Sequence, residues 1–554
     1  MTDAQAAVVG ADLAGFVRAF HQRTKHRFGG YANGPETLDW DAQPAPFRHF
    51  DGAPRIALPL ATDDDLDITG RLALPLSALD APLPALPLSL RTLGALLHLS
   101  LGLTAWKSTG PDRWAVRANP SSGNLHPAEA YVVLSGVEGV PDGLHHYLPD
   151  SHELECRARH DDGTRAAGAR LHVGLSSVMW RETWKYGERA FRYCQLDAGH
   201  AVACLRYAAA LLGWSVREHA ALPSAALAAL LGVDRAQDFP ARRVADTELE
   251  EAELLLAVTC DGDAPDAPAP AGIEWLGVAS PIDPHPMYRW PVLAEVADAT
   301  RSTGRRVTPD MPAPFAAARA HDRPVGDILL GRRSAQRFDP HHVMARDEFG
   351  QLLARLMPVA AAPWDALPDT FRIDLVLFVH RVEGVAPGVY LLVRGAPERG
   401  VTARLADRFA LTPVRGLPPR VDLRLLSEMP PPALARLARS VHCHQDIASN
   451  ACFALGMLCD FDAALAGAPA GYRALHRQCG LMGQVLYLEA EALGLRGTGI
   501  GCFFDDAVHE LLGLEDTATQ TLYHFTVGRA VDDARIESSP AYAQRAPAEQ
   551  GWSR

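Results

Sequence analysis

Three short segments of this chain combine residue types that suit a phosphorylated ligand. In the first, Arg332-Arg333-Ser334, a guanidinium group can hold a phosphate through two parallel hydrogen bonds while the neighbouring hydroxyl donates another. The same residues could also form the basic end of a surface helix. Taken alone, this segment leaves both interpretations open.

The second segment is glycine-rich and reads Gly497-Thr498-Gly499-Ile500-Gly501-Cys502. It follows a predicted long helix, whereas a Rossmann dinucleotide fingerprint places its glycines between a strand and the helix that follows. This order argues against a dinucleotide fingerprint. A strand or loop that lets a ligand approach the backbone, or a plain packing role, remains possible.

The third segment, Asn119-Pro120-Ser121-Ser122-Gly123-Asn124, offers two hydroxyls, side-chain amides and a flexible backbone within one turn. Such residues are also common in ordinary turns, so the composition does not decide between a ligand loop and a simple connection.

The elements around these segments divide the chain into four parts. Residues 1–90 are rich in Pro, Asp and Leu and predict an irregular N-terminal arm. A first domain is expected over 91–260, and a stretch dense in Pro, Asp and Ala marks a linker at 261–290. A second domain is expected over 291–554.

The two domains show the same order of predicted elements. Each has a helix, two strands joined by a turn, a long helix ending at Leu-Gly, and a short helix ending in Leu-Leu-Gly. LAALLGVD near residue 230 and VHELLGLED near residue 512 illustrate the correspondence. The pattern predicts a diverged two-unit repeat in which helices flank a mainly antiparallel sheet, an α+β class.

Several of these segments together resemble one known family. PSSGNLHPAEAYVV, WRETWKYGERAFRYCQLDAGHA, GRRSAQRF and GTGIGCFFDDAVHELLGL are similar to the motifs of the nitroreductase superfamily. The branch they resemble most is that of the SagB-type dehydrogenases, which includes azoline oxidases. The N-terminal stretch HQRTKHRFGGYANGPETLDWDAQPAPFRHF also resembles that branch. The resemblance covers nearly the whole chain and implies two tandem nitroreductase-like domains with FMN as cofactor.

The motifs are distributed unevenly between the halves, and the losses are complementary. The resemblance implies a flavin between two subunits, one giving the Arg-x-Ser arm and glycine segment and the other the Pro-Ser-Ser turn. Here the first half retains only the turn and the second half only the arm and glycines. We therefore expect an intramolecular pseudo-dimer with one flavin site. Its expected ligands are Arg332, Ser334, Gln336, Gly499, Ile500, Gly501 and Arg529, closed by Pro120, Ser121, Ser122 and Asn124. The family usually has Arg or Lys at the position of Gln336.

Lys185-Tyr186 matches a Lys-Tyr pair that azoline oxidases use near the flavin. Oxidising an azoline removes a proton from carbon, so a base beside the ring is required. A lysine with a lowered pKa, or a tyrosine ionised by that neighbour, could serve. The pair could instead be a structural helix start. His126, His200 and Asp197 are expected to be packed or hydrogen-bonded core groups.

The leading function is an FMN-dependent dehydrogenase of a peptide-derived or other specialised metabolite, reoxidised by dioxygen. The alternatives are an NAD(P)H-dependent reductase of nitro compounds, quinones or enones, and a non-catalytic scaffold in a biosynthetic complex. Expected partners are a small-molecule or modified-peptide substrate and biosynthetic proteins. The oligomeric state is expected to be a monomeric pseudo-dimer or a homodimer.

The composition indicates the class of protein, its location and the partners it does not suit. Hydrophobic residues at 48% and charged residues at 21% are typical of a soluble globular protein. The net charge of −13, without any basic block, argues against nucleic acid or an anionic membrane as partner. No signal peptide or membrane span is seen, so a cytoplasmic location is expected.

The nine cysteines form no CxxC pair, which argues against a disulfide framework or structural zinc. His442-Cys443-His444 is an isolated pattern, and no metal site is expected from it.

Overall fold

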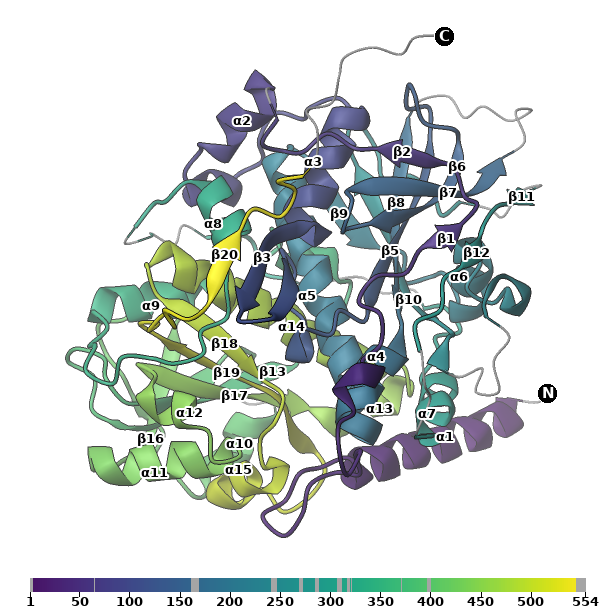
Figure 1. Cartoon of the computed structure of the whole chain (residues 1–554). Coiled ribbons are helices and arrows are strands. Elements are labelled where there is room, and N and C mark those ends of the chain that lie inside the picture. The colour runs from purple at the N-terminus through teal and green to yellow at the C-terminus, as the bar shows by residue number, and fades with distance from the viewer. Residues whose placement is uncertain are drawn as a thin grey trace.

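The computed structural model describes residues 3–63, 65–160, 169–240, 247–268, 273–283, 288–305, 311–315, 319, 321–369, 371–395 and 400–544. Two antiparallel sheets flanked by helices pack side by side around two long central helices (Figure 1). The expected α+β class is confirmed.

The first sheet belongs to the first half of the chain. Its strands run in the spatial order β11-β7-β6-β5-β8-β10-β9, and β2 also pairs with β7. Neighbours pair antiparallel throughout. The strands are β2 (Arg55–Ala57), β5 (Ala128–Ser135), β6 (Gly143–Leu148), β7 (Glu153–His160), β8 (Arg170–Ser177), β9 (Ser215–Glu218), β10 (Glu251–Thr259) and β11 (Ile273–Trp275).

The second sheet repeats this arrangement. Its order is β15-β16-β14-β13-β17-β19-β18, so that β16-β14-β13-β17-β19-β18 corresponds strand by strand to β7-β6-β5-β8-β10-β9. The predicted two-unit repeat is therefore present in the topology. The strands are β13 (Ile373–Val379), β14 (Gly388–Val393), β15 (Thr412–Pro413), β16 (Asp422–Glu428), β17 (Phe453–Asp460), β18 (Arg496–Ile500) and β19 (Thr519–Gly528).

The short Leu-Leu-Gly helices end in the same way in both halves. Helix α6 (Ser224–Leu231) stops at Gly232 with φ +68°, and α15 (Asp505–Leu512) stops at Gly513 with φ +70°. This left-handed backbone is open to glycine without steric penalty, which explains why both helices stop at that residue.

The long helices α5 (Ala190–Leu211) and α14 (Gly471–Ala492) cross at a pair of glycines. A Cβ atom at Gly199 would overlap the carbonyl oxygen of Arg477, and one at Gly480 would overlap that of Leu196. Each glycine thus meets the carbonyl three residues before the other glycine. The reciprocal contact shows that the halves are related by a local twofold axis, the geometry of a pseudo-dimer.

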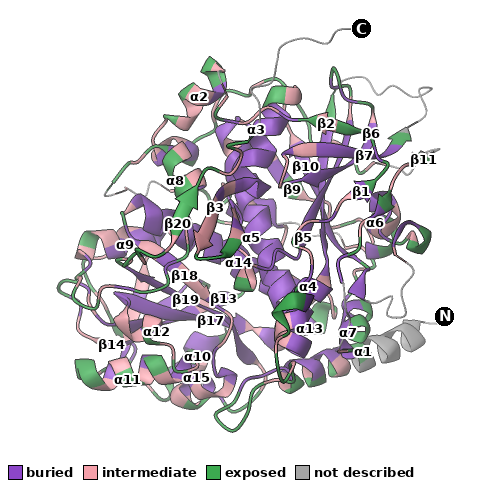
Figure 2. Cartoon of the chain, in the orientation of Figure 1, coloured by how far each residue is buried: buried purple, intermediate pink, exposed green. Residues whose placement is uncertain are grey.

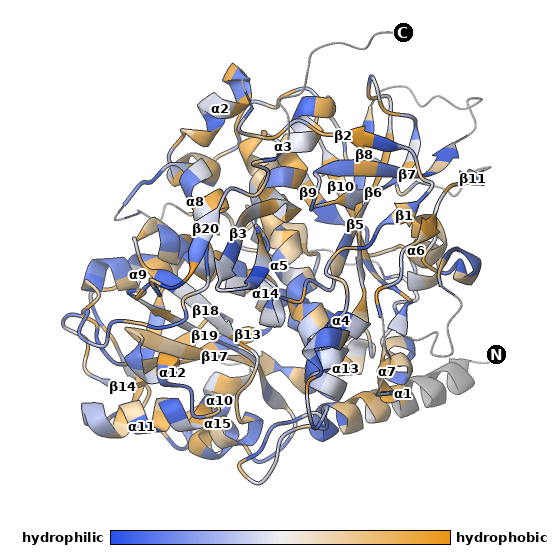
Figure 3. Cartoon of the chain, in the orientation of Figure 1, coloured by the Kyte–Doolittle hydropathy of each residue, from blue (hydrophilic) through white to orange (hydrophobic). Residues whose placement is uncertain are grey.

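The two halves share one interior. A single hydrophobic cluster includes residues of both sheets and both central helices, and nearly all of α5 is buried in Figure 2. The outer helices are amphipathic. In α11 (Pro431–Val441) the buried residues Leu434, Ala438 and Val441 recur at helical spacing, while Arg436 and Arg439 are exposed, and the helix shows both hydrophilic and hydrophobic segments in Figure 3.

The N-terminal arm is more regular than its composition predicts. It contains α1 (Asp3–Arg23), α2 (Leu66–Leu72) and the start of α3 (Leu90–Leu101). The expectation of an irregular arm is wrong for α1, whose alanine-rich sequence favours a helix. From the last residue of α1 onward, the arm contacts both halves. Arg23 Nη2 pairs with Glu188, and Lys25 Nζ lies 2.8 Å from Asp506.

Two distant segments complete small sheets. Strand β20 (Glu537–Ser539), near the C-terminus, pairs with β3 (Leu103–Thr109), which pairs with β4 (Asp112–Arg117) (Figure 1). The stretch expected as a linker lies partly outside the described residues. Its described part includes β11 and also β12 (Val278–Ala279), which pairs with β1 (Phe50–Asp51). Among the described helices, none combines the length and apolar character needed to cross a membrane.

Candidate active site

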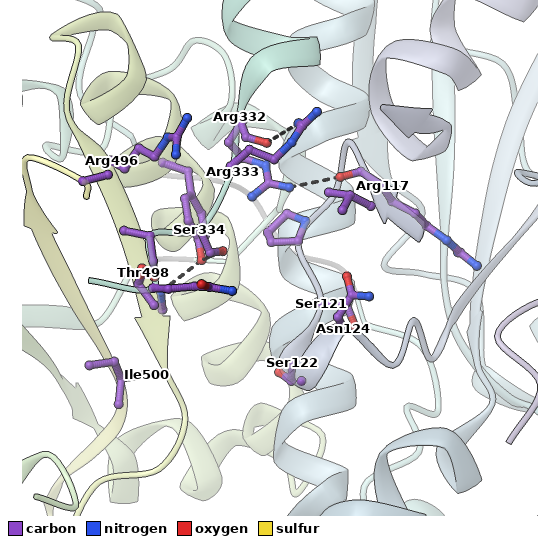
Figure 4. A pocket seen from close by; sticks show the side chains of 18 of the residues that line it. Arg117, Ser121, Ser122, Asn124, Arg332, Arg333, Ser334, Arg496, Thr498 and Ile500 are labelled. Carbon is purple, nitrogen blue, oxygen red and sulfur yellow. Dashed lines mark hydrogen bonds between the residues drawn. The ribbon is translucent and has the colours of Figure 1, made fainter. Parts of the chain in front are cut away.

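A cavity of about 750 Å³ lies between the halves. Eleven of the thirteen residues predicted for the site line it, and Figure 4 shows the first-half turn facing the second-half arm and strand across it. These residues are Pro120, Ser121, Ser122, Asn124, Tyr186, Arg332, Ser334, Gln336, Gly499, Ile500 and Gly501. Lys185 and Arg529 are the two that do not line it.

The second-half wall consists of two extended segments. Ser334 forms a parallel bridge with Gly497, and the backbone N–H of Ala335 donates to the Gly497 carbonyl at 3.1 Å. The Tyr487 hydroxyl lies 2.8 Å from Ser334 Oγ and accepts a hydrogen bond of 3.0 Å from the N–H of Gly499. One tyrosine of α14 therefore fixes the Arg-x-Ser arm against the glycine strand β18.

Aromatic rings explain the glycines of this strand. A Cβ atom at Gly499 would overlap the Tyr523 hydroxyl, and one at Gly501 would overlap the ring of Tyr193. Only glycine allows the strand to lie this close to the rings, so the cavity wall is formed by bare backbone there.

The first-half wall is a tight turn with left-handed backbone at Gly123, Asn124 and His126, whose φ angles are +60°, +59° and +56°. Ser121 Oγ stabilises it by accepting from the N–H of His126 at 2.8 Å. The Tyr186 hydroxyl fills the space beside Gly123, because a Cβ atom there would lie 2.5 Å from it.

Positive charge gathers at one end of the cavity. Lys107, Arg332, Arg333 and Arg496 all line it. Burial, and then the charges of neighbouring arginines, lower the pKa of Lys107, while burial followed by the charge of Arg332 lowers the pKa of Arg333 to about 10. Arg496 is paired with Asp532 at 2.7 Å. This end therefore favours an anionic ligand group.

Arg332 also joins the halves. Its Nε and Nη2 donate to the carbonyl oxygens of Ala118 and Arg117 at 3.1 and 3.0 Å. Only part of its guanidinium group is thus left for a ligand. Lys107 and Arg496 are not among the residues predicted from the sequence. Lys107 lies on β3, which reaches the site through its place beside β4 and β20, whereas Arg496 begins β18, directly before the predicted glycine segment.

Asp197, expected to be a core group, is a candidate site acid. It lines the cavity, and the N–H of Ser122 donates to both its carboxylate oxygens at 3.1 Å, while Ser122 Oγ donates to Oδ1 at 2.9 Å. Burial raises the pKa of Asp197 to about 7, although hydrogen bonds from Ser121 and Ser122 oppose the shift. This carboxyl can therefore both give and take a proton near neutral pH.

A second carboxyl lies behind it. Glu182 is fully buried, and within the described residues neither of its oxygens has a hydrogen-bond partner. Burial, and then the charge of Asp197, raise its pKa well above the ordinary value. Glu182 therefore holds its proton more tightly than an ordinary glutamic acid.

Lys185 and Tyr186 point to different surroundings. Successive residues on a helix are turned by about 100°, so on α4 (Met179–Tyr186) only one of them faces the cavity. Lys185 Nζ lies 5.8 Å from the Trp40 ring centroid. Burial, and then the charge of Glu182, raise the pKa of Tyr186 well above its ordinary value. This is opposite to the ionised tyrosine considered from the sequence.

The remaining predicted groups have clear environments. Arg529 is exposed just beyond β19, and its Nε donates to His342 at 3.1 Å. His200 is buried between Gln484 and Tyr523, and burial lowers its pKa to about 3. His126 is buried as well. His442 Nε2 lies 2.9 Å from the Nδ1 of His524. Across the described ranges, no three His, Cys, Asp or Glu side chains gather as metal ligands.

The twofold axis defines a second position, where β9 takes the place of β18. A hollow of only about 40 Å³ is found there, enough for one or two waters. Arg473 donates to Glu251 and Glu253 at 2.7 and 3.0 Å, and Arg477 donates to Glu253 at 2.7 Å. These buried ion pairs fill the space that is open at the first position. The motif losses are thus matched by the loss of one of two cavities.

Comparison with known proteins agrees with this architecture. Residues 429–529 match the nitroreductase family model. A protein of Methanocaldococcus jannaschii named as a nitroreductase is 29% identical over 137 residues, 23% of this chain and 66% of that protein. This chain therefore matches just under two thirds of that relative's length.

Solved structures extend the likeness to nearly the whole chain. A protein of Anabaena variabilis described as a nitroreductase aligns with 93% of this chain and 99% of its own, with a TM-score of 0.67 and 22% identity. A component of the Escherichia coli microcin synthetase complex aligns with 36% of this chain and 70% of its own, with a TM-score of only 0.28 and 17% identity. The chain thus carries a nitroreductase-family region at residues 429–529, within a nitroreductase fold duplicated along its length.

Proposed function

We propose that this protein is an FMN-dependent oxidoreductase with a single flavin site built from both halves. The observation that carries the proposal is the cavity itself. It unites the Arg-x-Ser arm and glycine strand of one half with the Pro-Ser-Ser turn of the other, while the twofold-related position is nearly closed.

The residues present suit FMN. A volume of about 750 Å³ is within the range of ligand pockets. The cationic end formed by Lys107, Arg333 and Arg496 would hold the phosphate, and the backbone at Gly499 and Gly501 would lie against the ring system. Asn119 Oδ1 is buried in the lining without a hydrogen-bond partner among the described residues, and so could accept from a ligand. When bound, FMN would supply a two-electron acceptor.

The chain's own residues would handle the proton. Asp197, with a pKa of about 7, can take a proton at its carboxylate, directly or through the hydroxyl of Ser122. Tyr186, which stays protonated, would donate a hydrogen bond and orient the substrate. The Ser121–Asn124 turn, which forms the first-half wall of the cavity, would limit the access of water to the bound substrate. Lys185 would act on Tyr186 through its charge, since its amine lies 5.4 Å from that ring.

The reaction we propose is dehydrogenation of a C–N or C–C bond in a peptide-derived or other specialised metabolite, as in the SagB-type branch that the motifs resemble. A base of pKa near 7 supports this direction, because removing a proton from carbon is the step that needs one. Biosynthetic proteins that deliver the substrate are the partners that fit this role.

The test compares two electron routes in the purified protein. Anaerobic mixing with an azoline-containing peptide should bleach the flavin absorbance, whereas NADH or NADPH with an added quinone should give little turnover. Rapid NAD(P)H oxidation without bleaching by azolines would identify a reductase instead. A colourless protein that FMN cannot reconstitute would contradict both and indicate a scaffold.

A further inference from the structure

Two free cysteines from different elements meet at the wall of the cavity. Cys502 lines the cavity directly after Gly501, and Cys443 lies in the loop after α11. Both are partly exposed. Each thiol is the largest influence on the pKa of the other.

The loop that carries Cys443 is held against Cys502. The side-chain amide of Gln445 donates to the carbonyl oxygens of both His442 and Cys502, each at 2.9 Å. Cys443 and His444 adopt left-handed backbone with φ angles of +52° and +58°. Neither is a glycine, so the surrounding contacts must impose this conformation. The close approach of the thiols is therefore a built feature.

Neighbouring groups make the two thiols unequal. The interactions with Cys443, then with His26, and the charge of Arg189 hold the pKa of Cys502 well below its usual range, whereas the pKa of Cys443 is raised. Arg189 is fixed there, because its Nη2 donates to the carbonyl of Gly501 at 3.0 Å. Cys502 is therefore the nucleophile, and Cys443 keeps its proton until its sulfur attacks the oxidised Cys502.

The core contains a second close pair for comparison. The sulfur atoms of Cys459 and Cys479 are 3.6 Å apart, and both residues have zero exposure. Burial raises the pKa of Cys459 well above its ordinary value. The two sulfur atoms of this pair are in contact, but both residues are buried and inaccessible to reagents. The pair therefore shows whether close approach of two thiols is enough for oxidation when solvent access is lacking.

We infer that Cys502 and Cys443 form a peroxide-oxidisable dithiol in the wall of the cavity. The Cys502 thiolate attacks hydrogen peroxide, forming an S–O bond and breaking the O–O bond, and hydroxide leaves as water after taking a proton. The Cys443 sulfur then attacks Cys502, forming the disulfide and releasing a second water. Two thiols are oxidised and one peroxide is reduced. Only the source of peroxide, reoxidation of a flavin by dioxygen, rests on the proposed function.

The experiment adds hydrogen peroxide to the purified full-length protein and counts free thiols after denaturation. The expected result is a loss of two from the nine thiols, with peptide mapping that joins Cys443 to Cys502. Cys459→Ser, the matched control, should still form this disulfide. Cys443→Ser should stop at the sulfenic acid, detected as a dimedone adduct on Cys502.

Two results would overturn the inference: Cys443 and Cys502 both staying reduced, or a disulfide forming between Cys459 and Cys479 instead. Because peroxide is added directly, the test gives the same answer whether or not the protein binds FMN. Failure of the flavin proposal is therefore distinguishable from failure of this one.

Discussion

Replacing Asp197 by Asn should make the protein more stable and less active, and the gain should depend on pH. Asp197 is buried and its pKa is raised from 3.8 to about 7. The folded state therefore holds a proton that the unfolded chain releases above about pH 4. Stability contributed by this carboxyl is present below about pH 4 and is lost as pH rises to about 7. Asparagine stays neutral and can still accept from Ser122, so it avoids this loss.

The size of this pH-dependent stabilisation follows from the interval between the lower pH of the comparison and the raised pKa of Asp197. A tenfold change in proton affinity corresponds to about 1.4 kcal/mol, and the interval from pH 5 to the pKa of about 7 covers roughly two such steps. The stabilisation of Asp197→Asn over wild type should therefore be roughly 3 kcal/mol larger at pH 8 than at pH 5. Guanidinium unfolding followed by tryptophan fluorescence at both pH values measures this difference. Turnover should fall about 100-fold or more, because Asn cannot take a proton.

Asp505 provides the opposite control. It is buried and pairs with Arg189 and Arg192 at 2.9 and 2.8 Å, and although burial opposes the effect these charges lower its pKa. Because it is ionised in both states between pH 5 and 8, Asp505→Asn should destabilise the fold equally at the two values. If Asp197→Asn shows the same effect at pH 5 and pH 8, or destabilises more at pH 8, the assignment of Asp197 as a strained buried acid is wrong.

Three further substitutions test other parts of the site. Gly499→Ala should abolish tight FMN binding, seen as flavin lost on desalting, because its Cβ would overlap a tyrosine of the wall; Gly467→Ala, which has no atom within 4 Å, should keep its flavin. Glu253→Ala removes the carboxylate partner of the buried Arg477 and one of the two partners of Arg473, and should cost about 3–5 kcal/mol in unfolding free energy, without adding a second flavin. Tyr186→Phe should lower kcat more than Lys185→Ala does; the reverse order in steady-state assays would return the catalytic role to the lysine.

The repeat and most of the site could be predicted from sequence because local signals carry them. The Leu-Leu-Gly endings reflect a backbone conformation that glycine adopts readily, as Gly232 and Gly513 show. The Arg-x-Ser arm, the glycine strand and the Pro-Ser-Ser turn are each short and contiguous. Their complementary loss in the two halves predicted one cavity, and the structure has one large and one nearly closed position.

The remaining features depend on tertiary contacts that leave no local pattern. Asp197 looks like any polar residue on a helix, and its role arises from Ser122, 75 positions away. Lys107 lies on β3 opposite Ser538 of the C-terminal β20, a pairing between segments far apart in the sequence. Arg529 is among the flavin ligands expected from the sequence, yet β19 ends before it at Gly528 and Arg529 is exposed. The contacts of Asp197 and Lys107 join residues that are far apart in the sequence, so no local pattern predicts them.

One measurement addresses the central claim directly, namely that the two halves together hold one flavin. Flavin-free protein is titrated with FMN and binding is followed by quenching of flavin fluorescence, with wild type compared to Arg333→Ala in one half and Ser122→Ala in the other. We predict saturation at one FMN per chain, with weaker binding in both variants. Saturation at two per chain, or binding that is insensitive to either half, would contradict that claim.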